Sequence, residues 1–259
     1  WKNVQFKLEA EKAITAYVVS PNRFLRYSFV RIAAAALILL GLGSSALYMN
    51  YNGYFSKKIT VTTGINDKNI VVALSDGSKI TMNRNSEFSY RENFGKHSRD
   101  VKLKGEAFFE ISPDKEKPFI IDAVKASVKV VGTSFNVITE NPESAVEVYV
   151  KTGKVLLSDI DNSKSISLEP EFVGKIGSAI SDKSVNNNPN YMSWNTGRLV
   201  YDRQKLDVVF RDLKRVYNLE IVADDKSILE NQWTSPIDNV SEETIIQLIC
   251  VSFNLSYTK

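Results

Sequence analysis

The sequence has very little cysteine or histidine, two of the residues from which catalytic and metal centres are often built. Its 259 residues include one cysteine, Cys250, and one histidine, His97. A single cysteine cannot form an intrachain disulfide, and a single histidine cannot build a His-rich zinc site. A glycine-rich loop of the kind that cradles phosphate groups is also absent. The sequence therefore excludes a disulfide scaffold, a His-rich zinc enzyme and a P-loop nucleotidase.

Charge and composition exclude further classes of protein. The chain has 33 Lys and Arg residues against 30 Asp and Glu residues, a net charge of +3. This small excess, without a dense basic block, does not favour direct binding of nucleic acid. A hydrophobic content of 43% and a charged content of 24% exclude a disordered or collagen-like chain. The length suits one large domain or two ordinary ones.

One long stretch has no charge at all, and it extends from Ile32 to Ser56. Its first twenty residues are mostly apolar, and as a helix they span roughly 30 Å, about the thickness of a bilayer core. A buried core helix and a cleaved signal peptide are the alternatives. The stretch is long for an uncharged core helix, and at least 31 residues precede it, which is long for a signal peptide. We therefore expect a transmembrane helix at residues 28–51.

Charges on either side of this helix predict its orientation. The basic residues that flank it are Arg23, Arg26 and Arg31 before it, and Lys57 and Lys58 after it. Positive charges are enriched on the cytoplasmic side of a membrane. We therefore expect a single-pass protein of the inner membrane, with a cytoplasmic N-terminus and a periplasmic C-terminal bulk.

The segment before the helix is too short to be a domain. The chain begins with Trp1 and not with Met, so we interpret residues 1–27 as the remnant of a longer cytoplasmic N-terminal region. Apolar residues between Val4 and Val18 recur at helical spacing until Pro21. A short helix is expected before Pro21.

After the helix, the apolar pattern changes to alternation, which is typical of strands. Ten short apolar segments are separated by Gly, Pro, Asn or Asp, and Asp76-Gly77 is a hairpin-type turn. The expected strands lie at 59–61, 70–74, 80–82, 101–103, 108–111, 119–121, 128–131, 135–138, 146–150 and 155–157. No helical pattern separates them, so we expect an all-β domain of hairpins or solenoid-like turns over residues 52–158. Residues 159–191 are polar and form either a linker or peripheral strands.

Residues 192–259 combine strand and helix patterns, which predicts a small α+β domain. Apolar residues from Leu206 to Tyr217 follow the stripe of an amphipathic helix, and Ser241 is a suitable N-cap for a second one. The second helix is expected to bury the face of Ile246, Ile249, Cys250 and Phe253. The predicted order is strand 199–201, the first helix, strand 219–222, an irregular or strand segment around Trp233, the second helix and strand 255–257.

The remaining candidates for chemistry have simpler structural explanations. His97 lies in a polar stretch that reads as an exposed loop, and Cys250 falls on an apolar helix face. Glu106 and Glu110 would share one face of a strand, and a solvated sheet face explains them better than an acid/base pair. We therefore expect no enzyme activity, no metal site and no cofactor.

Several motifs of the β-rich region resemble the FecR family of membrane-anchored anti-sigma factors. The motifs are Asp76-Gly77-Ser78, Gly105-Glu106-Ala107-Phe108-Phe109-Glu110, Lys117-Pro118-Phe119, Gly132-Thr133-Ser134-Phe135-Asn136-Val137, and Lys151-Thr152-Gly153-Lys154-Val155. The stretch around Trp194 and Gly197-Arg198-Leu199-Val200-Tyr201 resembles the domain that follows in Bacteroidetes-type members. Its strand and helix order is also similar to that of the secretin/TonB short N-terminal domain. Ser75 and Glu171 depart from the family pattern, which usually has Pro and Gly there.

The resemblance implies a transmembrane regulator. Such a protein relays a signal from the signalling domain of an outer-membrane TonB-dependent transporter to a cytoplasmic extracytoplasmic-function (ECF) sigma factor. The sigma factor binds the region before the anchor, of which residues 1–27 remain here. The alternative is a membrane-anchored periplasmic structural or glycan-binding module. That alternative has little support, because the pair Phe108-Phe109 can present at most one ring on each side of a strand.

A small open sheet has edges that can accept a strand of another protein. On this basis we predict that a partner contacts the strands of the C-terminal domain. The candidate partner-binding residues are Leu199, Val200, Tyr201, Trp233, Leu255 and Tyr257.

Overall fold

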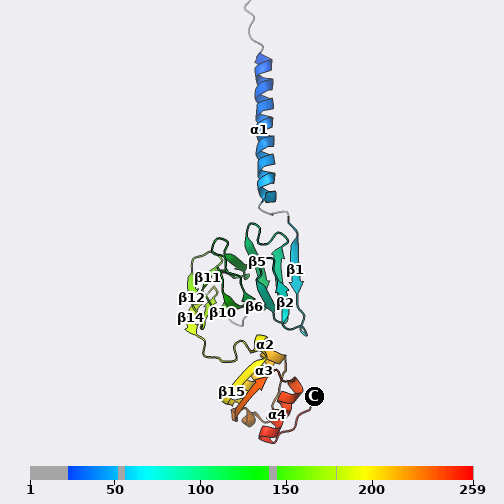
Figure 1. Cartoon of the computed structure of the whole chain (residues 1–259), viewed down its shortest axis with the longest axis vertical. Helices are drawn as coiled ribbons and strands as arrows, with labels where there is room; N and C mark the ends of the chain where they lie inside the picture. Colours follow the sequence, from blue (N-terminus) through cyan, green and yellow to red (C-terminus); the bar gives the residue numbers. More distant parts are fainter. Residues whose placement is uncertain (1–22, 52–55, 140–144, 179, 259) are drawn as a thin grey trace, which may run out of the picture. The chain divides into compact units, whose positions relative to one another are not determined.

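The computed structural model describes residues 23–51, 56–139, 145–178 and 180–258 (Figure 1). The chain divides into two units, residues 1–54 and 55–259. The short helix expected before Pro21 lies outside the described residues.

The first unit contains one long helix, α1 (Arg23–Tyr51). Its apolar part, Val30–Met49, is long and apolar enough to cross a membrane, and its side chains are exposed. The helix matches the uncharged stretch of the sequence, as expected for a single-pass membrane anchor.

The second unit begins with two seven-stranded sheets. The strands of the first sheet, in spatial order, are β1 (Lys58–Thr62), β4 (Glu87–Arg91), β5 (Arg99–Lys104), β7 (Phe119–Asp122), β8 (Ala126–Val130), β11 (Val155–Asp159) and β12 (Ser165–Leu168). Those of the second sheet are β14 (Ser181–Val185), β13 (Phe172–Ile176), β10 (Val146–Thr152), β9 (Ser134–Ile138), β6 (Glu106–Glu110), β3 (Lys79–Met82) and β2 (Ile70–Ala73). Neighbouring strands are antiparallel except β5 and β7, which are parallel because β6 between them belongs to the other sheet.

The all-β prediction for this region is confirmed, and the predicted strands form. The chain reverses at Asp76-Gly77 between β2 and β3, where Gly77 has a φ of 86°. Strand β4 was not predicted, because its sequence Glu87–Arg91 has only two apolar residues. Residues 159–191, left open between a linker and peripheral strands, contain β12, β13 and β14.

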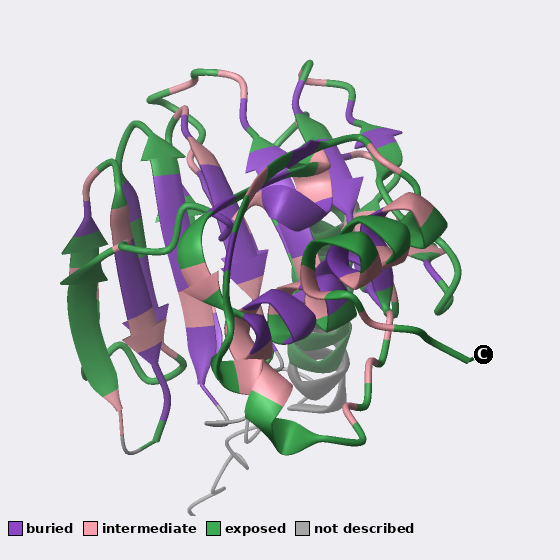
Figure 2. Ribbon diagram, turned by 90° about the horizontal axis from the view of Figure 1, so that it is seen from below, coloured by how far each residue is buried: buried purple, intermediate pink, exposed green. Residues whose placement is uncertain are grey.

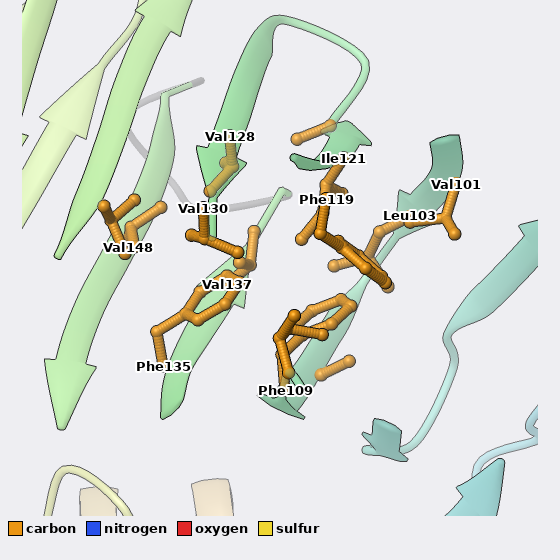
Figure 3. Close-up of a cluster of buried hydrophobic side chains, with 14 of the residues drawn as sticks. Val101, Leu103, Phe109, Phe119, Ile121, Val128, Val130, Phe135, Val137 and Val148 are labelled. Atoms are coloured by element: carbon orange, nitrogen blue, oxygen red, sulfur yellow. The ribbon is translucent and has the colours of Figure 1, made fainter. Parts of the chain in front are cut away.

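The two sheets share one hydrophobic core. Alternate residues of the central strands point between the sheets, as Figure 3 shows for Phe109, Phe119 and Phe135. The rings of Phe109 and Phe135 are stacked with centroids 5.1 Å apart, and the Phe109 and Phe119 rings meet edge to face at 6.2 Å. These offset and T-shaped contacts are the favoured geometries for aromatic pairs. The region is therefore a β-sandwich.

The chain passes from the first sheet to the second through a tight turn at Gly105. Its φ of 96° lies in a region that residues with a side chain rarely adopt. A Cβ atom there would lie 2.5 Å from Ser86 Oγ, so only glycine fits without a shift of its neighbours.

The C-terminal domain follows the sandwich within the same unit (Figure 1). It contains α2 (Ser193–Thr196), β15 (Arg198–Lys205), α3 (Leu206–Tyr217), the 3-10 helix η1 (Lys226–Glu230), β16 (Gln232–Asp238) and α4 (Glu242–Phe253). Strands β15 and β16 form an antiparallel two-stranded sheet. Helix α3 buries all five residues of the predicted apolar stripe, which are Leu206, Val209, Phe210, Leu213 and Tyr217. The α+β class is confirmed.

Two predicted strands of this domain do not form. Residues 219–222 and 255–257 have no strand assignment. In the first, Leu219 and Ile221 still pack against the domain core while their neighbours are exposed. The alternation of apolar and polar residues sets which side chains face the core. A strand also needs a neighbouring strand with which its backbone can form hydrogen bonds.

The buried face of α4 is also shifted from the prediction. Ile245 and Ile249 are buried, whereas Ile246, Cys250 and Phe253 are half-buried. Ser241 is the N-cap, as predicted, and its Oγ accepts a hydrogen bond from Thr244 N at 3.2 Å. The apolar residues of α4 surround the helix, so the sequence pattern alone left the orientation of the helix open.

Candidate functional site

The C-terminal domain packs on the outer face of the second sheet. In strand β6, Ala107 and Phe109 point into the sandwich core, while Phe108 points outward and joins the core of the C-terminal domain. In Figure 2, which is coloured by burial, many residues of the sandwich strands are buried. Phe108 and Phe109 are both buried, so neither ring is available as an exposed platform for a glycan.

Glu106, beside Phe108, is the centre of a polar cluster at this junction. Its Oε2 accepts a hydrogen bond from Asn83 Nδ2 at 2.8 Å, and its Oε1 accepts one from Asn136 Nδ2 at 2.9 Å. Arg215 Nη2, from α3 of the C-terminal domain, donates to Oε1 at 3.1 Å. The expectation of a solvated sheet face is therefore wrong for Glu106 and holds for Glu110, which is exposed.

The charge of Arg215 is stabilised in this cluster. Burial disfavours the charged guanidinium, but Glu106 and other negative or polar neighbours outweigh it and raise the pKa of Arg215. The guanidinium also lies over the ring of Tyr191, 5.0 Å from its centroid, in a cation–π contact. Arg215 thus connects the sandwich, the segment that follows β14, and helix α3.

A second polar contact fixes the start of the C-terminal domain. The hydroxyl of Tyr191 donates to Glu147 Oε1 at 2.6 Å, and Lys175 Nζ lies 3.4 Å from Glu147 Oε2. Burial and the adjacent Glu147 carboxylate raise the pKa of Tyr191, so its hydroxyl stays protonated and remains a donor. The Tyr191 ring packs against Tyr149 with centroids 4.9 Å apart.

The free edge of β15 is capped by a side chain. Val200 N donates to Asn190 Oδ1 at 2.8 Å, and Asn190 Nδ2 donates to Val200 O at 3.1 Å. This side-chain amide therefore takes the place that a partner strand would occupy at Val200. On β16, the residue opposite Val200 is Pro236, which has no N–H to donate. Both features are typical of sheet edges protected against strand addition.

Asn190 is itself held by helix α3. Its Nδ2 also donates to Asp212 Oδ2 at 3.0 Å. Burial raises the pKa of Asp212 above its usual range, although hydrogen bonds and the nearby Arg215 favour its charged form.

The predicted partner-binding residues fall into two groups. Leu199, Tyr201 and Trp233 are buried in the core of the C-terminal domain, where the Tyr201 and Trp233 rings pack 5.6 Å apart. Val200 and Tyr257 are exposed, and Leu255 is half-buried. The structure does not bring the six together on one surface strand.

Exposed apolar side chains of this domain were missed by the sequence reasoning. Val251 and Leu248, three residues apart on α4, are 84% and 42% exposed, and Val222 is 81% exposed. A helix surface with residues three apart presents them on the same side. The available signal was the composition of α4, which has more apolar residues than one buried face requires.

No metal site is found in the part of the chain that the structure describes. No group of three or more His, Cys, Asp or Glu side chains there is placed to hold a metal ion.

Comparison with known proteins agrees with this organisation. The FecR protein family model matches residues 59–156, and the FecR C-terminal model matches residues 198–259. Two crystal structures of a candidate anti-sigma factor from Parabacteroides distasonis ATCC 8503 are similar, at 29% sequence identity. Each aligns with 78% of this chain, and the alignments cover 95% and 94% of the crystallised chains with TM-scores of 0.59 and 0.58. No curated protein sequence matches.

Proposed function

We propose that this chain, which belongs to the FecR family of anti-sigma factors, relays a signal from an outer-membrane TonB-dependent transporter to a cytoplasmic ECF sigma factor. The family is one of regulators and not of enzymes. The observation that carries the proposal is the combination, in one chain, of an apolar helix long enough to cross a membrane with both FecR regions.

We place the anchor in the inner membrane, with the N-terminus in the cytoplasm. Three arginines before the apolar helix, against two lysines after it, support this orientation. The sandwich and the C-terminal domain are then periplasmic, and residues 1–27 belong to the sigma-binding side. A protease added to spheroplasts is expected to digest the C-terminal domain and to leave an epitope fused before Trp1 intact. The reverse pattern would contradict the orientation.

The transporter contact is proposed for the C-terminal domain, at Val200 and Tyr257 and on the exposed side of α4. Leu199, Tyr201, Trp233 and Leu255 support that surface from within or beside the domain core. The Asn190 cap and Pro236 argue against simple strand addition at the centre of the β15–β16 sheet. Exposed apolar side chains such as Val251 therefore offer the better surface for a partner.

The junction gives a physical route for the signal. Arg215 on α3 and Glu106 on β6 join the C-terminal domain to the sandwich through a charge-assisted hydrogen bond. The C-terminal domain is therefore attached to the sandwich. A partner that moves the C-terminal domain would transmit that movement to the sandwich.

The test is a binding measurement with the full chain in detergent micelles. The ligand is the purified signalling domain of the cognate TonB-dependent transporter. Val251→Asp is expected to weaken binding by about tenfold or more, because it places a charge in an apolar contact. Leu156→Asp is the matched control, since Leu156 is an exposed apolar residue of the sandwich.

The same two variants are compared in cells by transcription from a promoter that depends on the sigma factor. Val251→Asp is expected to abolish the response to the transporter's substrate, and Leu156→Asp to preserve it. Equal binding and equal response in both variants would contradict the proposed surface. A failure of the wild-type chain to bind the signalling domain would contradict the relay itself.

A further inference from the structure

A small pocket lies where the chain leaves the sandwich and enters the C-terminal domain. Its volume is about 300 Å³, at the lower end of the range of small-ligand sites. Its polar lining comes from Tyr149 on β10, Glu171 before β13, Asn186, Asn187 and Asn188 after β14, and Tyr191. None of these side chains belongs to the apolar surface of α4, so the pocket is separate from the surface proposed for the transporter.

Glu171 adopts a strained backbone conformation at this pocket. Its φ of 70° lies in the left-handed region, which is unfavourable for a residue with a side chain. Its backbone N donates to Val150 O at 2.8 Å, and its carbonyl accepts from Asn186 N at 2.8 Å. A glycine could make both bonds without strain. What glutamate adds is its exposed carboxylate, whose Oε2 accepts a hydrogen bond from the Tyr149 hydroxyl at 3.0 Å.

The asparagine loop that faces Glu171 is fixed by its own hydrogen bonds. Asn188 N donates to Asn186 Oδ1 at 3.0 Å, and Asn186 Nδ2 donates to Asn188 O at 3.1 Å. Asn190 N donates to Asn188 Oδ1 at 2.9 Å. The loop is therefore ordered before any ligand arrives, and the side chain of Asn187 between these residues is exposed. Preorganisation of this kind lowers the entropic cost of binding.

The chemistry of the lining indicates the class of ligand. Carboxylate and amide groups accept and donate hydrogen bonds to neighbouring hydroxyl groups, and tyrosine rings pack against C–H surfaces. Burial and the Glu171 carboxylate raise the pKa of Tyr149, so its hydroxyl stays a donor. A lining with one carboxylate, amides and phenols suits a neutral molecule rich in hydroxyl groups better than an anion. We propose that this pocket binds a neutral monosaccharide or the terminal unit of a short glycan.

Such a ligand would touch the sandwich, the asparagine loop and the first residues of the C-terminal domain. Because Tyr191 also donates to Glu147 and lies beneath Arg215, a bound sugar would strengthen the junction between the two domains. This inference goes beyond the relay proposed above, since neither the transporter nor the sigma factor is needed for it.

The experiment is a titration of the full chain in detergent micelles. Binding is measured by isothermal titration calorimetry and by the change in tyrosine fluorescence of the protein. The probes are glucose, galactose, mannose, N-acetylglucosamine and disaccharides of each, with sodium sulfate and calcium chloride as probes of anion and cation binding. A saturable response to at least one sugar is expected. No response to any sugar would overturn the proposal, as would a response to sulfate or calcium alone.

Glu171→Gly separates a binding role from a structural one. The variant keeps both backbone hydrogen bonds and relieves the strain, so it is expected to remain folded and to lose sugar affinity by about tenfold or more. Asn162→Gly is the matched control, because Asn162 has a φ of 53° in the turn between β11 and β12, outside the pocket. Unchanged affinity in Glu171→Gly, or equal losses in both variants, would overturn the proposal. Binding of the transporter's signalling domain by Glu171→Gly should be unchanged, so the two proposals fail separately.

Discussion

The β-sandwich and the C-terminal domain protect their sheets in different ways. The sandwich pairs fourteen strands in two sheets around one apolar core, and aromatic residues such as Phe109 are fully buried. The C-terminal domain pairs only two strands and protects their edges with Asn190 and Pro236. It also leaves apolar residues such as Val251 exposed.

This difference supports the proposal that the C-terminal domain is the contact surface and the sandwich its scaffold. The sandwich encloses its core between two sheets, whereas the C-terminal domain, with two strands and the helices α3 and α4, leaves Val251 and Val222 more than 80% exposed. Part of the outer face of the sandwich contacts the C-terminal domain, through Phe108 and Glu106. The core of the small domain therefore includes one residue of the sandwich, Phe108.

The largest expected effect is in the sandwich core. Phe109→Ala should lower the free energy of unfolding by about 3–5 kcal/mol, because it leaves a cavity among Phe88, Phe119 and Phe135. Leu156→Ala, at an exposed position of the same sandwich, should cost less than about 1 kcal/mol. Urea unfolding of the full chain in detergent micelles measures both. Similar losses would show that the core has been assigned to the wrong residues.

The next effect contrasts the two sides of α4. Ile249→Ala should lower the free energy of unfolding by about 2–4 kcal/mol, since Ile249 is buried in the domain core. Leu248→Ala, one residue earlier but largely exposed, should change it by less than about 1 kcal/mol. If Leu248→Ala proved the more costly, the exposed side of α4 would be part of the fold and not a contact surface.

An intermediate effect is expected at the junction. Glu106→Ala removes the acceptor shared by Asn83, Asn136 and Arg215, and should cost about 2 kcal/mol. Increased proteolysis of the C-terminal domain should accompany the loss. Lys102→Ala breaks an exposed ion pair with Asp122 on the outside of the sandwich and should have little effect. Equal losses would mean that the two domains are not held together through Glu106.

The smallest effect concerns the pH dependence of the C-terminal domain. The pKa of Asp212 is raised in the folded protein, so the native state loses stability relative to the unfolded chain as pH rises through that value. Asp212→Asn removes this loss and retains an acceptor for Asn190. Its gain in stability over the wild type should be absent in acid and should grow to less than about 1 kcal/mol at neutral pH. A gain that is equal at both pH values would contradict the raised pKa.

Much of the fold follows from local patterns. The uncharged stretch predicted α1, alternation predicted ten sandwich strands, and the stripe from Leu206 to Tyr217 predicted α3. Strands β4, β12 and β14 give weak patterns, because each contains at most two apolar residues. The candidate site was predicted less well. Leu199, Tyr201 and Trp233 are apolar, which does not distinguish a core residue from a contact residue.

Local sequence patterns are sufficient to predict the helix long and apolar enough to cross a membrane, the all-β and α+β classes, and the motifs of the FecR family. These depend on composition and on periods of a few residues, which local backbone geometry sets. Tertiary packing sets three further features: the Asn190 cap on β15, the link that Glu106 makes between two domains, and the pocket formed by Glu171 and the asparagine loop. The contacting residues are separated by ten positions at the Asn190 cap, by 22 between Tyr149 and Glu171 at the pocket, and by 109 between Glu106 and Arg215. Their contacts are set by how the sheets and helices pack, and no local pattern encodes them.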